Sequence, residues 1–318
     1  TPTILRSRAP FDRLAPPSAR IPAATMGGSM GSALARVAAA MAAASAIAAA
    51  VTFSSAAPAG PSLCAPRPVR LGYYGSWAAT RPCDAVTAAD LTAAADRYTH
   101  LAWAFAAVGV DGSLVPAAAG DPAAWRSFNA AVKAAAPGLH TSLAVGGWAF
   151  SSGATAGRWS AMVATPRTRA AFVTSAVQTL TAGGFDGLDI DWEFPGAPDR
   201  GGRPTDAAGL VALVTDLRAA FSTAGGRRLG LTVALPAGGP YARGFDVARL
   251  APHVDWFHVM AYDLAGGGRV TGAHTGIAGV TAAVRLYRGA RRGRLWRSRP
   301  AHPMAIAMPG RSGSTGGM

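Results

Sequence analysis

Past residue 68, short apolar runs alternate with Ala-rich segments of helical period, and no two-residue hairpin turn joins neighbouring runs. The apolar runs predict strands at residues 69–74, 99–105, 139–147, 185–191, 227–236 and 255–263. The intervening segments predict helices at residues 87–98, 121–136, 166–182 and 205–224. Strands that are linked through helices pair in parallel, and runs that are apolar at nearly every position are typical of strands covered on both faces. The pattern therefore predicts an α/β fold.

Two α/β architectures fit this alternation, a doubly wound sheet and a (β/α)8 TIM barrel. The turn after the first strand reads GYYGSW (72–77) and lacks the G-x-G-x-x-G pattern of a dinucleotide-binding sheet. Polar and aromatic residues lie at the carboxyl ends of several strands: Tyr73, Phe105, Trp148, Glu193, Tyr262 and Asp263. Because a barrel assembles its site from many strand ends, we expect the barrel, with a functional site at that face.

The first 57 residues do not share this pattern. They open with a stretch rich in Pro, Arg and Ser, and the Ala-rich apolar run 37–53 follows a short segment from Met26 that contains one Arg. This layout predicts an unstructured N-terminal extension and signal peptide over residues 1–57, a linker over 58–68, and a secreted, extracellular product. A membrane anchor is the other interpretation, but about 17 Ala-dominated residues are short for a hydrocarbon core about 30 Å thick. We therefore expect no membrane association after cleavage.

The formal net charge of +14 suggests a nucleic-acid partner until its distribution is considered. Residues 1–57 contribute +4 and residues 285–318 contribute +8, so residues 58–284 carry only +2. A nucleic-acid-binding protein places its basic side chains on the folded body. We therefore expect no nucleic-acid partner.

The two cysteines, Cys64 and Cys83, both follow the predicted cleavage site. An even pair close in sequence favours a disulfide in an exported protein, and two free thiols are the alternative. Neither cysteine has a His or Cys neighbour at zinc-binding spacing. We predict the disulfide and no zinc site.

The segment FDGLDIDWEF (185–194) places four acids in a run that is otherwise apolar. Side chains alternate along a strand, so Asp189, Asp191 and Glu193 share one face, which we expect to point into the barrel. We call these three residues the acid ladder; Asp186, one position out of phase, is set apart from them. Neighbouring members lie about 6.6 Å apart along the strand, close enough to share a proton. Because burial and like charge raise carboxyl pKa values, we expect one member to be protonated near neutral pH and Glu193 to act as a general acid.

Two other interpretations of the acid ladder compete with this one. A divalent metal would use carboxylate oxygens, but only His258 and Asp263 could complete its ligands, and we expect no metal and no other cofactor. Solvated acids at the end of a strand would account for Glu193 but not for Asp189, which should be buried.

The eight residues from Asp186 to Glu193 read DGLDIDWE and resemble, at every position, the D-G-x-D-x-D-W-E signature of the chitinases of glycoside hydrolase family 18. Four further stretches resemble that family's first, second, third and sixth strands, in order: GYYGSW (72–77), THLAWAF (99–105), AVGGW (144–148) and VMAYD (259–263). The resemblance covers roughly residues 69–275 and implies a (β/α)8 barrel enzyme acting on β-1,4-linked N-acetylglucosamine.

The resemblance also implies a substrate-assisted reaction with retention of configuration, in which the substrate's own N-acetyl oxygen is the nucleophile. Glu193 would be the general acid and base, and Tyr262 would donate a hydrogen bond to the acetamido oxygen. Asp191 would orient the acetamido group, with Asp189 as its proton-sharing partner. Five further matching positions would line the sugar sites: Tyr73, Phe105, Trp148, Met260 and Asp263. Core packing is the other interpretation of the aromatic members and of the Met.

Two features depart from the family pattern. Ala144 stands where the family's third strand carries a Ser, which removes a hydroxyl from below the acid ladder. Residues 285–318 are Arg-rich and read as a divergent or mistranslated tail of the predicted barrel domain 69–318, in which PMAIAMPGRS (303–312) resembles a seventh strand. We therefore expect an incomplete barrel without the eighth strand, its Trp, and the family's small α+β insertion.

Together these features predict a secreted, monomeric glycosidase of the endochitinase type, with chitin or N-acetylglucosamine oligosaccharides as its partners. A non-hydrolytic chitin- or glycan-binding protein, inactive because the barrel is truncated, is one alternative. An endo-β-N-acetylglucosaminidase acting on N-glycans is another. The presence of Glu193 favours an enzyme, because lectin-like members of the family typically lose that acid.

Overall fold

The computed structural model describes residues 68–265, 271–290 and 304–307. Residues 1–56 form a unit separate from residues 57–318, and this first unit lies wholly outside the described residues. The predicted signal peptide and all but the last residue of the predicted linker also lie outside them. The fold therefore belongs to the second unit.

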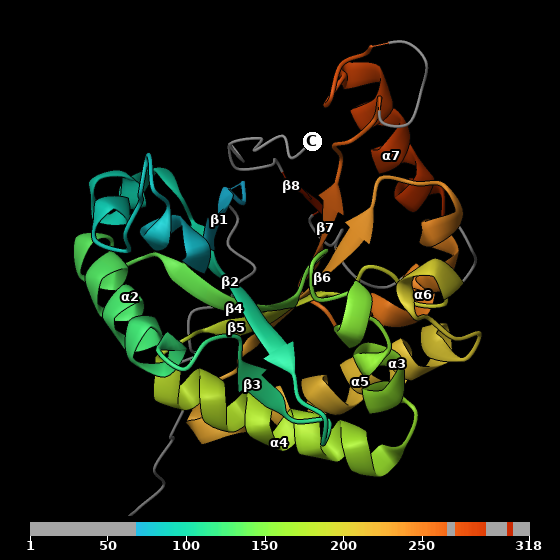
Figure 1. The fold of residues 1–318 in the computed structure, drawn as a ribbon, viewed down its shortest axis with the longest axis horizontal. Coiled ribbons are helices and arrows are strands. Elements are labelled where there is room, and N and C mark those ends of the chain that lie inside the picture. The colour runs from blue at the N-terminus through green and yellow to red at the C-terminus, as the bar shows by residue number, and fades with distance from the viewer. Residues whose placement is uncertain (1–67, 266–270, 291–303, 308–318) are drawn as a thin grey trace, which may run out of the picture. The chain divides into compact units, whose positions relative to one another are not determined.

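The core of this unit is one curved sheet of parallel strands with helices along its outer side (Figure 1). Its hydrogen-bonded order is β1 (Leu71–Gly75), β2 (His100–Val108), β4 (His140–Gly146), β5 (Gly187–Asp191), β6 (Gly230–Pro236), β7 (Trp256–Met260) and β8 (Met304–Ala307). All of these neighbours pair in parallel. A short strand that was not predicted, β3 (Leu114–Pro116), pairs antiparallel with β2 and lies off this path.

The prediction of an incomplete (β/α)8 barrel is confirmed by this sheet. The six predicted strands correspond to β1, β2, β4, β5, β6 and β7, and β8 lies inside the segment 303–312 that resembles a seventh strand. Within the described part of the chain, no further parallel strand hydrogen-bonds β8 to β1, although these two strands lie near one another. The curl therefore brings the two ends of the sheet together without pairing them.

The helices follow the strands in the predicted alternation, and they are α2 (Asp121–Ala135), α3 (Arg158–Val163), α4 (Pro166–Gly183), α5 (Asp206–Phe221), α6 (Val247–Leu250) and α7 (Ile277–Ala290). The sequence explains the limits of α4. Thr165 precedes it and accepts the main-chain N–H of Thr168 at 3.2 Å, which satisfies a free donor of the first turn. Gly184 ends it with a φ of 78°, a conformation that glycine adopts without steric cost.

The predicted helix at 87–98 is wrong in type, because residues Asp90–Arg97 form a 3-10 helix (η2). Before this turn, the N–H and hydroxyl of Thr87 each donate to the Asp90 carboxylate at 2.7 Å. Helices α3, α6 and α7 were not predicted. Short 3-10 turns complete the connections: η1 (Ser76–Thr80), η3 (Gly153–Thr155), η4 (Pro198–Arg200), η5 (Ala224–Gly226) and η6 (Pro240–Gly244).

Strand β5 is held in register by packing on both of its faces. On its outer face, the strand is followed by Trp192, which is buried and stacks on Trp159 of α3 with ring centroids 5.5 Å apart. On its inner face, a Cβ at Gly187 would lie 2.8 Å from the main-chain oxygen of Gly230 in β6. Only glycine fits so close an approach, so the first position of β5 fixes how the acid ladder enters the interior.

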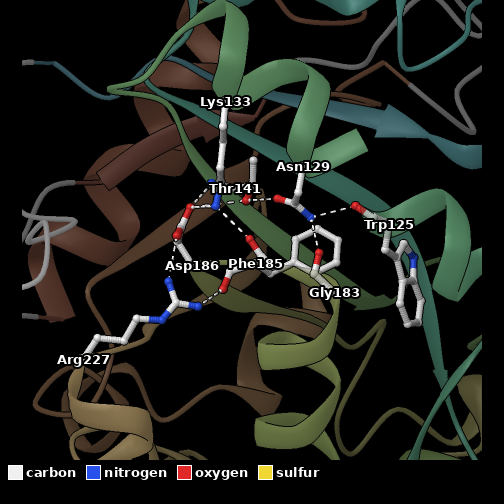
Figure 2. A network of polar contacts seen from close by, with 9 residues as sticks. Trp125, Asn129, Lys133, Thr141, Gly183, Phe185, Asp186 and Arg227 are labelled. Carbon is white, nitrogen blue, oxygen red and sulfur yellow. Dashed lines mark hydrogen bonds and ion pairs between the residues drawn. The ribbon is translucent and has the colours of Figure 1, made fainter. Parts of the chain in front are cut away.

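Asp186 immediately precedes β5 and joins a polar network away from the acid ladder (Figure 2). Its carboxylate lies 2.7 Å from Lys133 of α2 and 3.0 Å from Arg227, and it accepts the N–H of Thr141 in β4 at 2.9 Å. Asn129 extends the network by donating to main-chain oxygens of α2 and α4, at 2.9 Å each. Burial raises the pKa of the Asp186 carboxyl, but Lys133, the Thr141 N–H and Arg227 outweigh burial and hold the pKa below its ordinary value. Asp186 therefore braces the fold.

Candidate active site

Asp189, the innermost member of the acid ladder, is fully buried and hydrogen-bonded from two other strands. Its Oδ2 accepts the Tyr73 hydroxyl of β1 at 2.5 Å, and its Oδ1 accepts the Thr232 hydroxyl of β6 at 2.6 Å. A third strand, β7, places His258 Nε2 at 3.4 Å from Oδ1. Burial, followed by the charges of Asp189 and Asp191, raises the pKa of Tyr73 well above its ordinary value, so its hydroxyl remains a donor. Two hydroxyl donors thus satisfy a carboxylate that would be costly to bury alone.

Asp191, the middle member, is also buried, and its Oδ1 has no hydrogen-bond partner among the described residues. Burial, followed by the charges of Glu193 and Asp189, raises the pKa of its carboxyl well above the ordinary value. Burial and the neighbouring acids therefore both favour the protonated form of Asp191. Its unsatisfied oxygen is free to accept a hydrogen bond from a ligand.

Glu193 lies just past the end of β5 and is the outermost member of the acid ladder, with 9% of its surface exposed. Burial raises the pKa of its carboxyl to about 7, against the lowering effect of the Arg200 charge, and the charge of Asp263 raises it further. Its main-chain N–H donates to Ser151 Oγ at 3.2 Å, and its main-chain oxygen accepts from Arg200 Nε at 3.0 Å. A carboxyl with this pKa can both give and take a proton near neutral pH.

A cavity of about 480 Å³ lies at the carboxyl ends of β5, β6 and β7, and Glu193 is the member of the acid ladder that lines it. Five of the predicted site residues line it: Trp148, Glu193, Met260, Tyr262 and Asp263. Burial, followed by the charges of Asp191 and Glu193, raises the pKa of Tyr262, so its hydroxyl stays protonated and can donate a hydrogen bond. The Asp263 carboxylate is largely exposed and lies 3.2 Å from His274 Nδ1. The Glu193 carboxyl, the Tyr262 hydroxyl and the exposed Trp148 ring therefore lie around the same cavity.

The other two predicted sugar-site residues have different positions. Tyr73 reaches Asp189 below the cavity, and Phe105 packs under the exposed Trp77 with ring centroids 6.1 Å apart. A Cβ at Gly147 would lie 2.8 Å from the Phe105 ring, so the glycine before Trp148 makes room for that ring. Phe105 thus supports an exposed indole, and Trp77 is the ring that faces outward.

The profile of glycosyl hydrolases family 18 matches residues 69–308 of this chain, including every member of the acid ladder. The chain belongs to glycoside hydrolase family 18. This agrees with the signature in β5 and with the curved parallel sheet.

Similar proteins include two curated relatives and one solved structure. The chain is 36% identical over 200 residues to an endochitinase of Manduca sexta, covering 61% of this chain and 35% of that protein. It is 40% identical over 171 residues to chitotriosidase-1 of Mus musculus, covering 52% of this chain and 35% of that protein. The solved structure of chitinase ChiA74 from Bacillus thuringiensis has a TM-score of 0.62 and 25% identity, covering 76% of this chain and 48% of that one. The matches thus span about a third of the length of the two curated relatives.

Ala144 stands where the family 18 pattern has a Ser in the third strand. It pairs in register with Asp189 and is fully buried. On the opposite side of Asp189, the register brings Thr232 of β6 alongside, and its hydroxyl donates to the carboxylate at 2.6 Å. The expected loss of a hydroxyl from one neighbouring strand is therefore accompanied by a hydroxyl on the other.

Sequence reasoning missed several residues around this family 18 site. Thr232 was readable as the one polar position in the apolar run LGLTVALP, and Trp77 as the aromatic that ends GYYGSW. His258 was considered only as a metal ligand, but it lies beside Asp189. Arg200 and Ser151 contact Glu193 through its main chain, and no local sequence signal announces such contacts.

The remaining predictions concern metals, membranes and thiols. In the described ranges, no group of three or more His, Cys, Asp or Glu side chains is arranged to hold a metal ion. None of the helices within those ranges combines the length and apolarity that crossing a membrane requires. Cys83 is exposed and has no disulfide partner among the described residues, and its predicted partner Cys64 lies outside them. The disulfide stays a prediction.

Proposed function

We propose that this chain hydrolyses β-1,4-linked N-acetylglucosamine in chitin, by a retaining, substrate-assisted mechanism. One observation carries the proposal: Glu193, with a pKa of about 7, lines the cavity, and it follows the buried Asp191, whose pKa is also raised, on the same face of the strand. Membership of family 18 and similarity to proteins named endochitinase and chitotriosidase support it. Nothing in the mechanism requires a metal or cofactor.

In the first step, the Glu193 carboxyl gives its proton to the glycosidic oxygen, and the bond between that oxygen and C1 breaks. The carbonyl oxygen of the substrate's N-acetyl group attacks C1 from the opposite face and forms an oxazolinium ion. Asp191 accepts the acetamido N–H with its unsatisfied oxygen, and Tyr262 donates to the acetamido oxygen. These two contacts hold the internal nucleophile in line.

In the second step, the Glu193 carboxylate takes a proton from water, which attacks C1 and opens the oxazolinium ring. Two displacements at C1 leave the configuration retained. Negative charge on Asp191 stabilises the cationic ring, because proton sharing within the acid ladder lets Asp191 ionise when the ring becomes positive. Trp148 and Trp77 offer exposed indole faces on which pyranose rings stack.

The decisive experiment measures hydrolysis of a fluorogenic N,N′,N″-triacetylchitotrioside by the purified chain beside Glu193→Gln. Loss of the acid should lower kcat on the order of 10²- to 10⁴-fold. Asp191→Asn should lower kcat and leave binding of an N-acetylglucosamine oligosaccharide nearly unchanged. A parent chain that binds the oligosaccharide without hydrolysing it would establish the non-hydrolytic alternative, and a parent that does neither would overturn the proposal.

We also propose that the protein is exported and acts outside the cell as a monomer. The support is the Ala-rich run 37–53, which follows a basic segment and precedes small residues. Expression with and without residues 1–57, followed by assay of the medium and light scattering, tests both points. Retention of the full chain in the cell or a stable dimer would contradict them.

A further inference from the structure

Arg200 is a buried cation that the proposed reaction does not use. It ends the 3-10 helix η4 in the connection between β5 and α5, and only 8% of its surface is exposed. Its Nε donates to the main-chain oxygen of Glu193 at 3.0 Å, and its Nη2 donates to the main-chain oxygen of Trp148 at 2.8 Å. The same guanidinium group lies 3.6 Å from the centre of the Trp148 ring. One side chain therefore contacts the main chain of both Glu193 and Trp148, two of the residues that line the cavity.

The connection that carries Arg200 is itself fixed in place. Asp206, fully buried at the start of α5, accepts two main-chain N–H groups of this connection at 3.1 and 2.7 Å and the Ser160 hydroxyl of α3 at 2.7 Å. Gly201 has a φ of 69°, and a Cβ there would lie 2.6 Å from the main chain that precedes α3. A buried carboxylate and a contact open only to glycine thus define where Arg200 lies.

The contact with Arg200 changes what the exposed indole can do. Trp148 is 57% exposed, and an exposed side chain ordinarily loses conformational freedom when it binds a ligand. The guanidinium group packs on one face of the ring, and Trp148 also lines the cavity. A ring that is fixed before the sugar arrives loses less freedom on binding.

We propose that Arg200 is a positioning residue that fixes the Trp148 indole as a preformed sugar platform and ties it to the main chain of Glu193; this inference rests on the proposed function. Pyranose rings of N-acetylglucosamine are uncharged, so the guanidinium group makes no ion pair with substrate. It acts through geometry, by keeping the platform at a constant distance from the acid.

The charge of Arg200 has a second, measurable consequence. Four groups interact electrostatically with the Glu193 carboxyl: Arg200, Asp263, Asp191 and Tyr262. Burial has the largest effect on the pKa of Glu193 and raises it, whereas the Arg200 charge opposes burial. Replacing Arg200 with an uncharged residue should therefore raise the pKa of Glu193, and the alkaline limb of the activity profile should move to higher pH.

The first test compares Arg200→Gln and Arg200→Lys in the full chain, with chitotrioside as substrate. Arg200→Gln should raise KM, lower kcat/KM about tenfold and move the alkaline limb to higher pH. Arg200→Lys keeps the charge and should keep the limb, but it should recover only part of KM, because an ammonium group cannot reproduce the planar fork. The exposed Arg203→Gln, on the same connection, should change neither quantity. Equal losses in both Arg200 variants with an unmoved limb would reduce Arg200 to a structural role and overturn the proposal.

The second test asks whether Arg200 acts through Trp148. In a Glu193→Gln background, Trp148→Ala and Arg200→Gln should each weaken oligosaccharide binding about tenfold, and the combination should weaken it no further. Additive losses would overturn the proposal.

A sugar-free measurement separates this proposal from the proposed function. Acrylamide quenching of Trp148, taken as the difference from Trp148→Phe, should increase in Arg200→Gln because the indole is released. If the parent binds no sugar, the proposed function fails, and the quenching still decides whether Arg200 holds the ring. Unchanged quenching would overturn that role.

Discussion

Replacing His100 with Leu should make the free energy of unfolding less sensitive to acid. His100 begins β2, is 4% exposed and stacks on His140 with ring centroids 5.1 Å apart. Its Nδ1 lies 2.9 Å from the Thr99 hydroxyl, whereas its Nε2 has no partner among the described residues. Burial, followed by the charges that His140 and His258 would carry, lowers the pKa of His100 from 6.5 to about 3, and Asp186 opposes them. The folded protein therefore keeps this imidazole neutral where the unfolded chain binds a proton.

The sign and size of the effect follow from these two pKa values. Between them the unfolded state binds more protons, so the stability is intact above pH 6.5 and is lost as the pH falls towards 3. Acidification from about pH 7.5 to about 4.5 should cost the wild type about 2.6 kcal/mol through His100 alone. Leu has a similar volume and cannot titrate, so His100→Leu should be spared that loss.

Urea unfolding at these two pH values, followed by Trp fluorescence, measures the difference. The carboxylates titrate alike in both proteins and cancel in the comparison. His274→Gln, which removes an exposed imidazole, is the control and should follow the wild type. If His100→Leu loses as much stability on acidification as the wild type does, with equal m-values, the reasoning that burial keeps His100 neutral is refuted.

Three further predictions follow from single contacts. Gly146 has a φ of 107°, and a Cβ there would overlap a main-chain oxygen of β5, so Gly146→Ala should lower the free energy of unfolding by about 3 kcal/mol. Gly153 also has a positive φ but has open space around it, so Gly153→Ala should lower the free energy of unfolding by only about 1 kcal/mol. Urea unfolding of the two variants measures the difference. Asp186→Asn should lose about 1–2 kcal/mol at neutral pH. Because the folded pKa of Asp186 is depressed, this loss should begin to shrink below the unfolded pKa and should disappear as the pH falls through the folded pKa; a variant equally destabilised at acid pH would contradict the ion pairs. The kcat/KM for chitotrioside should fall above about pH 7, where Glu193 loses the proton that it donates, and a rate still rising beyond that pH would contradict its role.

The strands and the acid ladder were predictable because their signals are local. Each buried strand is apolar over most of its length, and the alternation of side chains along residues 186–193 separates Asp186 from Asp189, Asp191 and Glu193 without knowledge of any neighbouring strand. The parallel pairing of the strands also follows from the alternation of strands and helices.

What escaped prediction depends on how separate elements meet. The hydrogen bond from Thr232 to Asp189 requires the register of β5 against β6, and Arg200 reaches Glu193 and Trp148 only through the path of a connection. Helix α7 (Ile277–Ala290) was not among the predicted helices, although its residues are folded as a regular helix. The local sequence pattern thus locates the carboxyl groups of the acid ladder, whereas tertiary contacts determine which residues surround them.

The hydrogen bonds to Asp189 join the chemistry to the architecture. Tyr73 belongs to β1, at one end of the sheet path, and its hydroxyl crosses the interior to a carboxylate on β5, which has no main-chain pairing with β1. Together with the hydrogen bond from Thr232 of β6, this contact connects β1, β5 and β6 across the interior of a sheet in which, among the described residues, β8 and β1 are not hydrogen-bonded to each other. Loss of Asp189 would therefore leave the hydroxyl groups of Tyr73 and Thr232 without their acceptor, so it would weaken the interior of the sheet as well as the site.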